Sequence, residues 1–483
     1  MGSVVLGVLL LNAIMAAVGY CLLAPGLRGL PPLSWTTYAG VALLVGAGFI
    51  GVVLCGLAAA GAPTGVLLFL AVAAALVVGG LLCAALLPAR VRARMRFPTG
   101  AGASSNAPST LSAAVSAGAG FGVLLVVAGC VLAAFRSSPW LDDSWTFWLP
   151  KGLLVVERGL EPELFTRNDA YVMFVSPDYP LWWSIVSGLD MRFVGEVDLR
   201  AMNAQLGLLV AAFAAATARL LWGRVRPWIL WPAVLLVLAS PELLRQTQSG
   251  GADVPLALYL SLAVLTSACW VAWREGALLG LAFVFAAAAL STKNEAAPQL
   301  LVFLIVPSLL AWTPLGGRRL LPLYAMVGAA FLTTVPWHLW RARHGVGGDI
   351  SLTVAVDPRH LAAQAERAAP AARELLMHVT QPREWLVIIP AFLATCALGL
   401  VIERRPVWLV PVLGLAAALA FWVWVYWAGP LDLEFWLSTS SYRVIDPLLL
   451  TAGVTLPLLA ERLLQTARRP HERHAVTRAS TSS

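Results

Sequence analysis

The sequence predicts an all-α, polytopic transmembrane protein with about 13 membrane-spanning helices. Apolar residues make up 59% of the 483 residues, charged residues only 12%, and the mean hydropathy is +0.80. Many apolar runs approach twenty residues, the length that crosses a bilayer as a helix. These runs lack the alternation of barrel strands, so helices are the structures left to satisfy the backbone in lipid.

The spans follow from the apolar runs taken in chain order. We expect them at about residues 4–24, 37–60, 64–87, 113–135, 199–221, 228–240, 252–273, 277–291, 297–312, 319–340, 385–402, 407–428 and 444–460. The first run has no basic segment before it, so it reads as a span and not as a cleaved signal peptide.

The arginines predict the orientation. With the N-terminus outside and alternating spans, the inner loops and the tail hold eighteen of the thirty-three Lys and Arg residues but only four of the twenty-five acids. Cytoplasmic loops carry such an excess of cations, so the C-terminus is expected in the cytoplasm. The basic balance then reflects contact with membrane lipids, and nucleic acid is not expected as a partner.

The spans divide the chain into four parts: three transmembrane helices in 1–97, a cytoplasmic linker at 98–112, a larger transmembrane unit at 113–460 and a basic cytoplasmic tail at 461–483. Two outer loops, 136–198 and 341–384, hold many of the remaining acids. In the first we expect two interfacial helices, one over 145–156 and one starting near Pro180. In the second we expect a short helix over 361–369, ended by Pro370.

Asp142 and Asp143 form an acidic pair directly after an apolar span, in the run Ser-Pro-Trp-Leu-Asp-Asp-Ser-Trp. Charge at a membrane surface in so apolar a chain indicates a functional site. Asp178, which precedes Tyr179 and Pro180, is a second candidate in the same loop. Solvated loop acids remain the alternative, and for most of the tryptophans an aromatic belt is the simpler interpretation.

Lysine usage marks two positions. The chain has thirty-one arginines and only two lysines, Lys151 and Lys293, and both fall on the predicted outer side. A compact ammonium where arginine is otherwise the rule suggests contact with a phosphate or a carboxylate. Chance, with a local salt bridge from Lys293 to Glu295 or Asp253, is the alternative.

Two span ends on the outer side also carry charge. Asp253 follows the Gly250–Gly251 turn and starts a span, where either a functional acid or a helix cap is expected. Arg443 lies at the mouth of the last span, where it suits bidentate phosphate binding or simple snorkelling to the interface.

The order of these motifs resembles the GT-C superfamily of integral-membrane glycosyltransferases. The closest similarity is to its bacterial branch of protein O-mannosyltransferases and the lipid A aminoarabinose transferase. The resemblance covers about residues 113–460 and rests on short motifs: Asp142-Asp143, Asp178-Tyr179-Pro180, Ala252-Asp253, Thr292-Lys293-Asn294-Glu295 and Tyr442-Arg443. The chain departs from the pattern in its three additional N-terminal spans and its lack of a long soluble C-terminal domain.

The resemblance implies transfer of a sugar from a polyprenyl-phosphate donor to an acceptor hydroxyl on the outer face, with inversion. Such a transfer needs a carboxylate to take the proton and cations to stabilise the departing phosphate. We assign Asp142 as the general base and Asp143 or Asp178 as an orienting or acceptor-binding group. Cations for the donor phosphate would be Lys293 and Arg443, with Lys151 and Arg245 as further candidates, while Tyr179, Asp253 and Glu295 would hold these cations or bind sugar hydroxyls.

Several points stay open at the level of sequence. A polytopic transporter or lipid-linked sugar flippase is the competing class, and a non-catalytic scaffold is a third. No compact ligand spacing indicates a metal site, so no cofactor is expected to be obligatory, although Asp142, Asp143 and Asp253 could supply oxygen ligands to a divalent cation. The acceptor could be a glycan, a glycolipid or a protein. The composition favours the plasma (inner) membrane of a bacterium.

Overall fold

The structure is a computed structural model that describes residues 2–28, 30–95, 97, 109–166, 177–310, 317–347 and 352–481. The predicted linker at 98–112 therefore falls mostly outside the described residues, as do residues 167–176 of the first outer loop. Every named element of the described residues is a helix, and none is a strand. The all-α prediction is confirmed.

Nine helical segments of the described residues are long and apolar enough to cross a membrane. They are α1 (Gly2–Leu27), α3 (Ala39–Ala59), α4 (Val66–Leu86), α6 (Thr110–Ala134), α10 (Arg200–Leu221), α13 (Asp253–Trp273), the segment Gly317–His344 with α17 (Leu321–Leu332) and α18 (Val335–His344), the segment Pro406–Ala428 with α24 (Leu409–Ala428), and the segment Leu433–Ala467 with α25 (Leu433–Val444) and the first part of α26 (Asp446–Thr481).

Four shorter apolar helical segments complete the bundle. They are α11 (Pro227–Leu238), α14 (Gly276–Leu290), the segment Ala296–Leu309 with α15 (Ala296–Leu300) and α16 (Val306–Leu310), and α23 (Ile388–Glu403). Each coincides with a predicted span, but their lengths leave the total of about 13 spans a prediction. The chain is a multi-pass membrane protein in either case.

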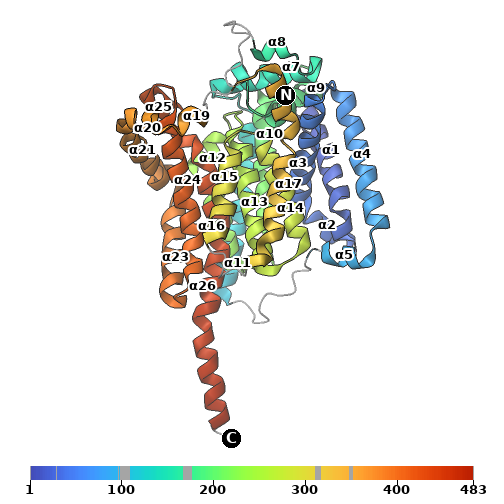
Figure 1. Ribbon diagram of the computed structural model, residues 1–483. Coiled ribbons are helices and arrows are strands. Elements are labelled where there is room, and N and C mark those ends of the chain that lie inside the picture. Colours follow the sequence, from blue (N-terminus) through green and yellow to red (C-terminus); the bar gives the residue numbers. More distant parts are fainter. Residues whose placement is uncertain are drawn as a thin grey trace.

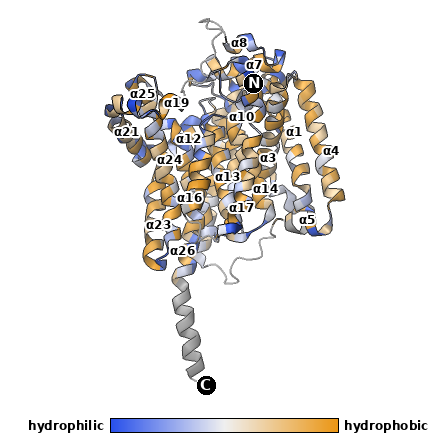
Figure 2. Ribbon diagram, viewed as in Figure 1, coloured by the Kyte–Doolittle hydropathy of each residue, from blue (hydrophilic) through white to orange (hydrophobic). Residues whose placement is uncertain are grey.

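The two ends of the bundle differ in composition. Figure 1 places the N-terminus at the same end as α7 (Leu149–Arg158), α8 (Pro162–Thr166) and α9 (Trp182–Val194), and the C-terminus at the opposite end. Apolar residues fill the middle of the helices and polar residues gather at their ends (Figure 2). We call the end with α7 the acidic end, and the end with α5 (Ala89–Met95) the arginine end.

The three N-terminal helices pack closely onto the rest. A Cβ atom on Gly19 would lie 1.8 Å from the Ala42 carbonyl oxygen, so α1 and α3 approach closely at this glycine, as small residues allow in membranes. Asn12 of α1 and Gln205 of α10 exchange two amide hydrogen bonds, of 2.6 and 3.1 Å. The additional N-terminal spans are thus joined directly to the larger unit.

The first outer loop contains both expected helices, with different surroundings. The first begins as a π-helical turn (Ser144–Trp148) and continues as α7. The second, α9, begins at Trp182 and is buried along most of its length. The two cross where Gly152 meets Gly188, because a Cβ on Gly152 would lie 2.1 Å from the Ser184 carbonyl oxygen.

The second outer loop folds into short helices against the end of α24. They are α19 (Leu352–Ala355), α20 (Pro358–Ala363), a 3-10 turn (Ala365–Arg367), α21 (Ala368–Thr380) and α22 (Pro382–Trp385). The prediction that Pro370 ends a helix over 361–369 is wrong. Pro370 lies in the first turn of α21, where its missing N–H breaks no intrahelical bond.

Candidate active site

The segment with Asp142 and Asp143 rests on the turn before α13. Ser144 Oγ donates to the Ser249 carbonyl at 2.5 Å, and Trp183 Nε1 donates to the Gly250 carbonyl at 2.9 Å. Gly250 has a φ of +69°, and a Cβ there would lie 2.6 Å from Pro139 Cγ. Glycine is needed at this position both for its conformation and for the space it leaves.

The two adjacent carboxylates have different surroundings. Asp143 is partly buried, and its Oδ2 lies 2.7 Å from Nη1 of Arg443. Asp142 is exposed, and its Oδ1 accepts a hydrogen bond of 3.1 Å from the Asp143 amide. Among the described residues, no cation pairs with the Asp142 carboxylate. Asp142 is therefore the more exposed acid of the pair.

Four further contacts connect Arg443 to other polar side chains and form one network in which cations and acids alternate. Arg443 Nη1 lies 3.6 Å from Oδ2 of Asp253, whose Oδ1 lies 2.8 Å from the Lys293 ammonium. Lys293 also lies 3.5 Å from Glu295 Oε1, which accepts a 2.8 Å hydrogen bond from the Tyr179 hydroxyl. We call Asp143, Arg443, Asp253, Lys293, Glu295 and Tyr179 the charge network.

Local structure explains how distant segments meet there. Asp253 is the first residue of α13, Arg443 lies in the last turn of α25, and Lys293 lies in the turn between α14 and α15. Burial alone would lower the pKa of Lys293, but the nearby Asp253 and Glu295 carboxylates raise that pKa above its ordinary value. Lys293 is thus held as a cation at neutral pH.

Asp178 lies beside the charge network and has partners of its own. Its Oδ2 accepts a hydrogen bond of 2.6 Å from Asn294 Nδ2 and lies 3.5 Å from Nη2 of Arg341. Trp337 Nε1 donates to the Asp178 carbonyl at 3.1 Å. Sequence reasoning did not single out Arg341 or Trp337, although an arginine at the outer end of a predicted span was an available signal.

Lys151 lies apart from the charge network. Its side chain is fully buried, and its ammonium donates to the carbonyls of Tyr179 (2.7 Å) and Pro177 (3.3 Å). The rings of Phe147, Phe165 and Trp337 lie 5.1–5.6 Å from the ammonium. Burial lowers the pKa of Lys151 to about 7. This geometry fits a residue that positions the Asp178–Tyr179 segment better than one that reaches a phosphate.

Arg245 lies at the rim. Its guanidinium makes two hydrogen bonds, of 2.8 and 2.6 Å, to the Glu242 carboxylate of α12 (Pro241–Gln246). It stacks between the rings of Trp140 and Tyr442, at 4.7 and 4.4 Å. Because Tyr442 directly precedes Arg443 in the chain, Arg245 borders the charge network. Arg245 does not belong to the network, since its carboxylate partner is Glu242.

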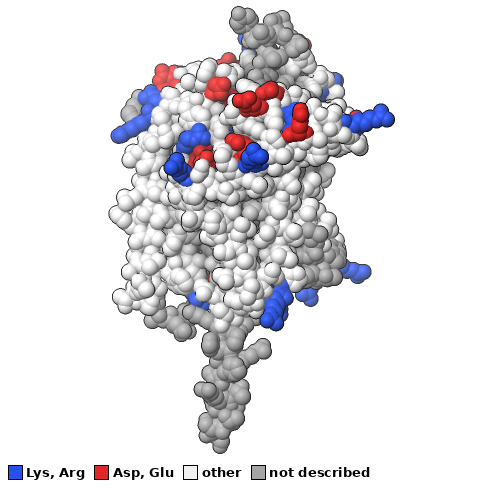
Figure 3. Space-filling model, turned by 90° about the vertical axis from the view of Figure 1, so that its left-hand side faces the viewer, with Lys and Arg blue, Asp and Glu red and all other residues white. Residues whose placement is uncertain are grey.

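On the surface, too, charged side chains lie at the two ends of the helix bundle. In Figure 3, acidic and basic side chains intermingle at the acidic end, a wide band without charge follows, and basic side chains appear at the opposite end. The described residues contain no group of three or more His, Cys, Asp or Glu side chains that could hold a metal ion. The dependence on a divalent cation stays untested.

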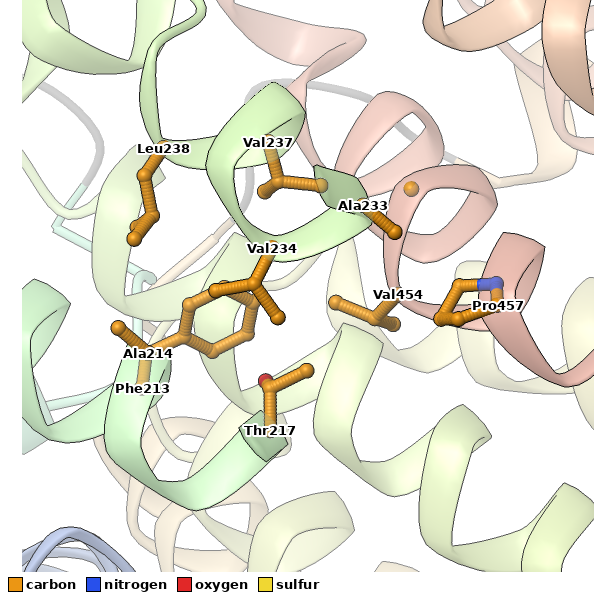
Figure 4. Close-up of a pocket in the computed structure, with 10 residues that line it drawn as sticks. Phe213, Ala214, Thr217, Ala233, Val234, Val237, Leu238, Val454 and Pro457 are labelled. Carbon is orange, nitrogen blue, oxygen red and sulfur yellow. The ribbon is translucent and has the colours of Figure 1, made fainter. Parts of the chain in front are cut away.

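A small apolar hollow lies elsewhere, between α10, α11 and α26 (Figure 4). Its walls are aliphatic and aromatic, with Thr217 as the polar exception, and they include Phe213, Val234, Val237, Val454 and Pro457. The hollow offers no charged group for chemistry. The polar groups at the acidic end are therefore the better candidate for the active site.

One protein-family model matches a part of the chain that includes several residues of this site. Residues 161–347 match the family model of the dolichyl-phosphate-mannose-protein mannosyltransferases. No curated protein and no solved structure matches the chain. The matched part contains Asp178, Tyr179, Arg245 and the Asp253–Lys293–Glu295 part of the charge network, while Asp142, Asp143, Lys151 and Arg443 lie outside it.

The family match confirms the resemblance predicted from the motifs and supports a membrane glycosyltransferase with a polyprenyl-phosphate-sugar donor. It covers less than half of the chain, from α8 to α18. Over residues 161–347 this multi-pass membrane protein is therefore similar to the dolichyl-phosphate-mannose-protein mannosyltransferases, a family of GT-C membrane glycosyltransferases.

Proposed function

We propose that the protein transfers a hexose or pentose from a polyprenyl phosphate to a hydroxyl of a cell-envelope acceptor, with inversion at the anomeric carbon. The observation that carries the proposal is the exposed Asp142 carboxylate beside the charge network, in which Arg443 and Lys293 are held by buried or partly buried acids. The acceptor is a glycan, a glycolipid or a protein.

In the proposed reaction Asp142 accepts the proton of the acceptor hydroxyl. The acceptor oxygen attacks the anomeric carbon and forms the new glycosidic bond. The bond between that carbon and the phosphate oxygen breaks, and its electron pair leaves with polyprenyl phosphate. Because a single displacement occurs from the opposite face, the configuration inverts.

The other residues serve this step. Arg443 and Lys293 would stabilise the negative charge that develops on the departing phosphate. Asp143 would fix the direction of the Arg443 guanidinium, since the two groups are 2.7 Å apart. Asp253 and Glu295 would hold Lys293, and Tyr179 would orient Glu295. Asp178 would position Asn294 and Arg341 at the edge of the site.

We propose that the acidic end faces the outside of the bacterial plasma membrane, with the N-terminus outside and the C-terminus in the cytoplasm. Glu434 and Arg404 are exposed at the two ends and suit a labelling test. In intact cells a membrane-impermeant maleimide should label Glu434→Cys and leave Arg404→Cys unlabelled until the membrane is permeabilised. The reverse pattern would contradict the proposed orientation.

The reaction is tested with purified protein in liposomes, supplied with polyprenyl-phosphate mannose or arabinose and cell-envelope acceptors. Asp142→Asn should lower the release of polyprenyl phosphate by about 100-fold or more, because a general base contributes 10²–10⁴-fold. Glu434→Gln is the matched control, since Glu434 is an exposed acid of the same end. Wild-type transport of the intact donor without release would favour a flippase, and release that does not depend on Asp142 would contradict its role.

A further inference from the structure

Two exposed tryptophans flank the Asp142 carboxylate. Trp140 and Trp145 are 42% and 50% exposed, while Leu141 between Trp140 and Asp142 is buried. Residues 137–141 are not helical, and the alternation of exposed and buried side chains is that of an extended segment. Trp140 therefore projects on the same side as Asp142. Helical structure begins at Asp142 and passes into the π-helical turn Ser144–Trp148, where Trp145 is exposed three residues after Asp142.

Trp140 is held rigidly. Its indole Nε1 donates to the Arg245 carbonyl at 3.0 Å, and its backbone amide donates to the Gln248 carbonyl at 3.3 Å. The Arg245 guanidinium covers the ring at 4.7 Å, and Glu242 fixes that guanidinium. Although Arg245 covers part of the indole, Trp140 as a whole residue is still 42% exposed.

This arrangement differs from that of an aromatic belt. Belt tryptophans anchor a protein by keeping the polar end of the indole at the lipid headgroups. In Trp140 the N–H points into the protein and the apolar ring surface is presented beside a carboxylate. A ligand suited to such a surface has an apolar face for stacking and hydroxyl groups at its edge.

We infer that Trp140 and Trp145 form an acceptor subsite for a saccharide, an inference that rests on the proposed function. One sugar ring of the acceptor stacks its C–H face on Trp140, with Trp145 as the second wall. The hydroxyls at the ring edge then reach Asp142, which takes the proton. An extended peptide would instead favour an unpaired strand edge or an apolar groove, and the described residues contain no strand.

The inference is tested by acceptor kinetics in proteoliposomes, with mannotetraose and an arabinan tetrasaccharide as saccharide probes and a Ser/Thr-rich dodecapeptide as the peptide probe. Trp140→Ala should raise the KM for the saccharide acceptor about tenfold, the upper range for an aromatic contact. The KM for the polyprenyl-phosphate donor should stay unchanged. Trp140→Phe should restore most of the affinity, and Trp145→Ala should show a smaller rise.

Trp228→Ala is the matched control, because Trp228 is 36% exposed at the start of α11, at the arginine end. Saturation-transfer NMR with mannotetraose on nanodisc-embedded protein gives a readout without turnover, and its signal should fall in Trp140→Ala and persist in Trp228→Ala. A change in donor KM alone, an equal loss with peptide and saccharide, or use of the peptide alone would each overturn the inference. No release with any acceptor in the wild type, by contrast, would count against the proposed function itself.

Discussion

Ion pairs lie at both ends of the helix bundle, but they are organised differently. At the arginine end, Arg226 pairs with Glu461 at 3.3 Å, Arg462 pairs with Glu403 at 2.9 Å, and Arg224 pairs with Glu275. Each of these pairs joins one cation to one acid between neighbouring helix ends. At the acidic end, two cations share three carboxylates in a continuous network, and the neighbouring Asp142 has no cation partner in the described part of the chain.

The difference indicates different roles. A separate pair is electrically complete and ties two helix ends together. The charge network holds Arg443 and Lys293 in fixed positions, yet the surplus of acids keeps the local charge negative. A bound phosphate group would replace part of these contacts, so we expect the acidic end to respond to substrate and the arginine end to stay unchanged.

The largest effect is expected from breaking the network at Arg443. Arg443→Gln should lower kcat/KM for the polyprenyl-phosphate donor by about 100-fold, because it removes a cation that stabilises the leaving phosphate. Arg462→Gln is the control at the arginine end and should retain nearly wild-type activity. Initial rates in proteoliposomes measure both. Equal losses of activity in the two variants would show that both ion pairs affect only the stability of the protein.

A different response is expected at Asp253, which lies between the two cations. Asp253→Asn removes a negative charge that competes with phosphate, so inhibition by the product polyprenyl phosphate should become about tenfold tighter. The turnover number should fall at the same time, because product leaves more slowly. Product-inhibition constants provide the measurement. Weaker inhibition would mean that Asp253 mainly orients the cations.

Lys151 should give a pH-dependent effect on stability. Its pKa is lowered by burial to about 7, whereas an unfolded lysine titrates near about 10.4. Between these values the unfolded chain binds the extra proton, so the stability of the wild type should rise with pH. Lys151→Met should lose this rise, which thermal unfolding in nanodiscs at about pH 6.5 to 9.5 can detect. Arg158→Met, an exposed cation of α7, is the control, and an identical pH profile in all three proteins would contradict the assignment.

The smallest effect is expected from metal removal. Incubation with EDTA should leave the rate of sugar transfer unchanged, since the described residues offer no metal-ligating cluster at either end. Added Mg²⁺ or Mn²⁺ should not raise the rate of the chelated protein. A loss with EDTA that is reversed by one of these ions would place a cation among the acids of the charge network.

Much of the candidate site was accessible from the sequence. Charge at the end of an apolar span is costly, which indicates Asp253 and Arg443. Lysine usage indicates Lys293, with Glu295 as its nearby acid, and the structure brings these four side chains into one network. Lysine usage was also the basis of the prediction for Lys151. Because one-dimensional patterns give the depth of a residue but not its neighbours, the sequence could not distinguish a lysine beneath aromatic rings from one beside carboxylates.

The sequence by itself determined that the chain is helical and multi-pass, that the middle of the helices is apolar and that charges lie toward their ends, because lipid forces hydropathy and charge to follow depth in the membrane. Tertiary packing decided which of two adjacent carboxylates is paired. Arg443 reaches Asp143 from 300 residues away because α25 and the turn before α13 meet the segment after α6. No local pattern encodes that contact, which pairs Asp143 with Arg443 and leaves Asp142 with no cation partner among the described residues.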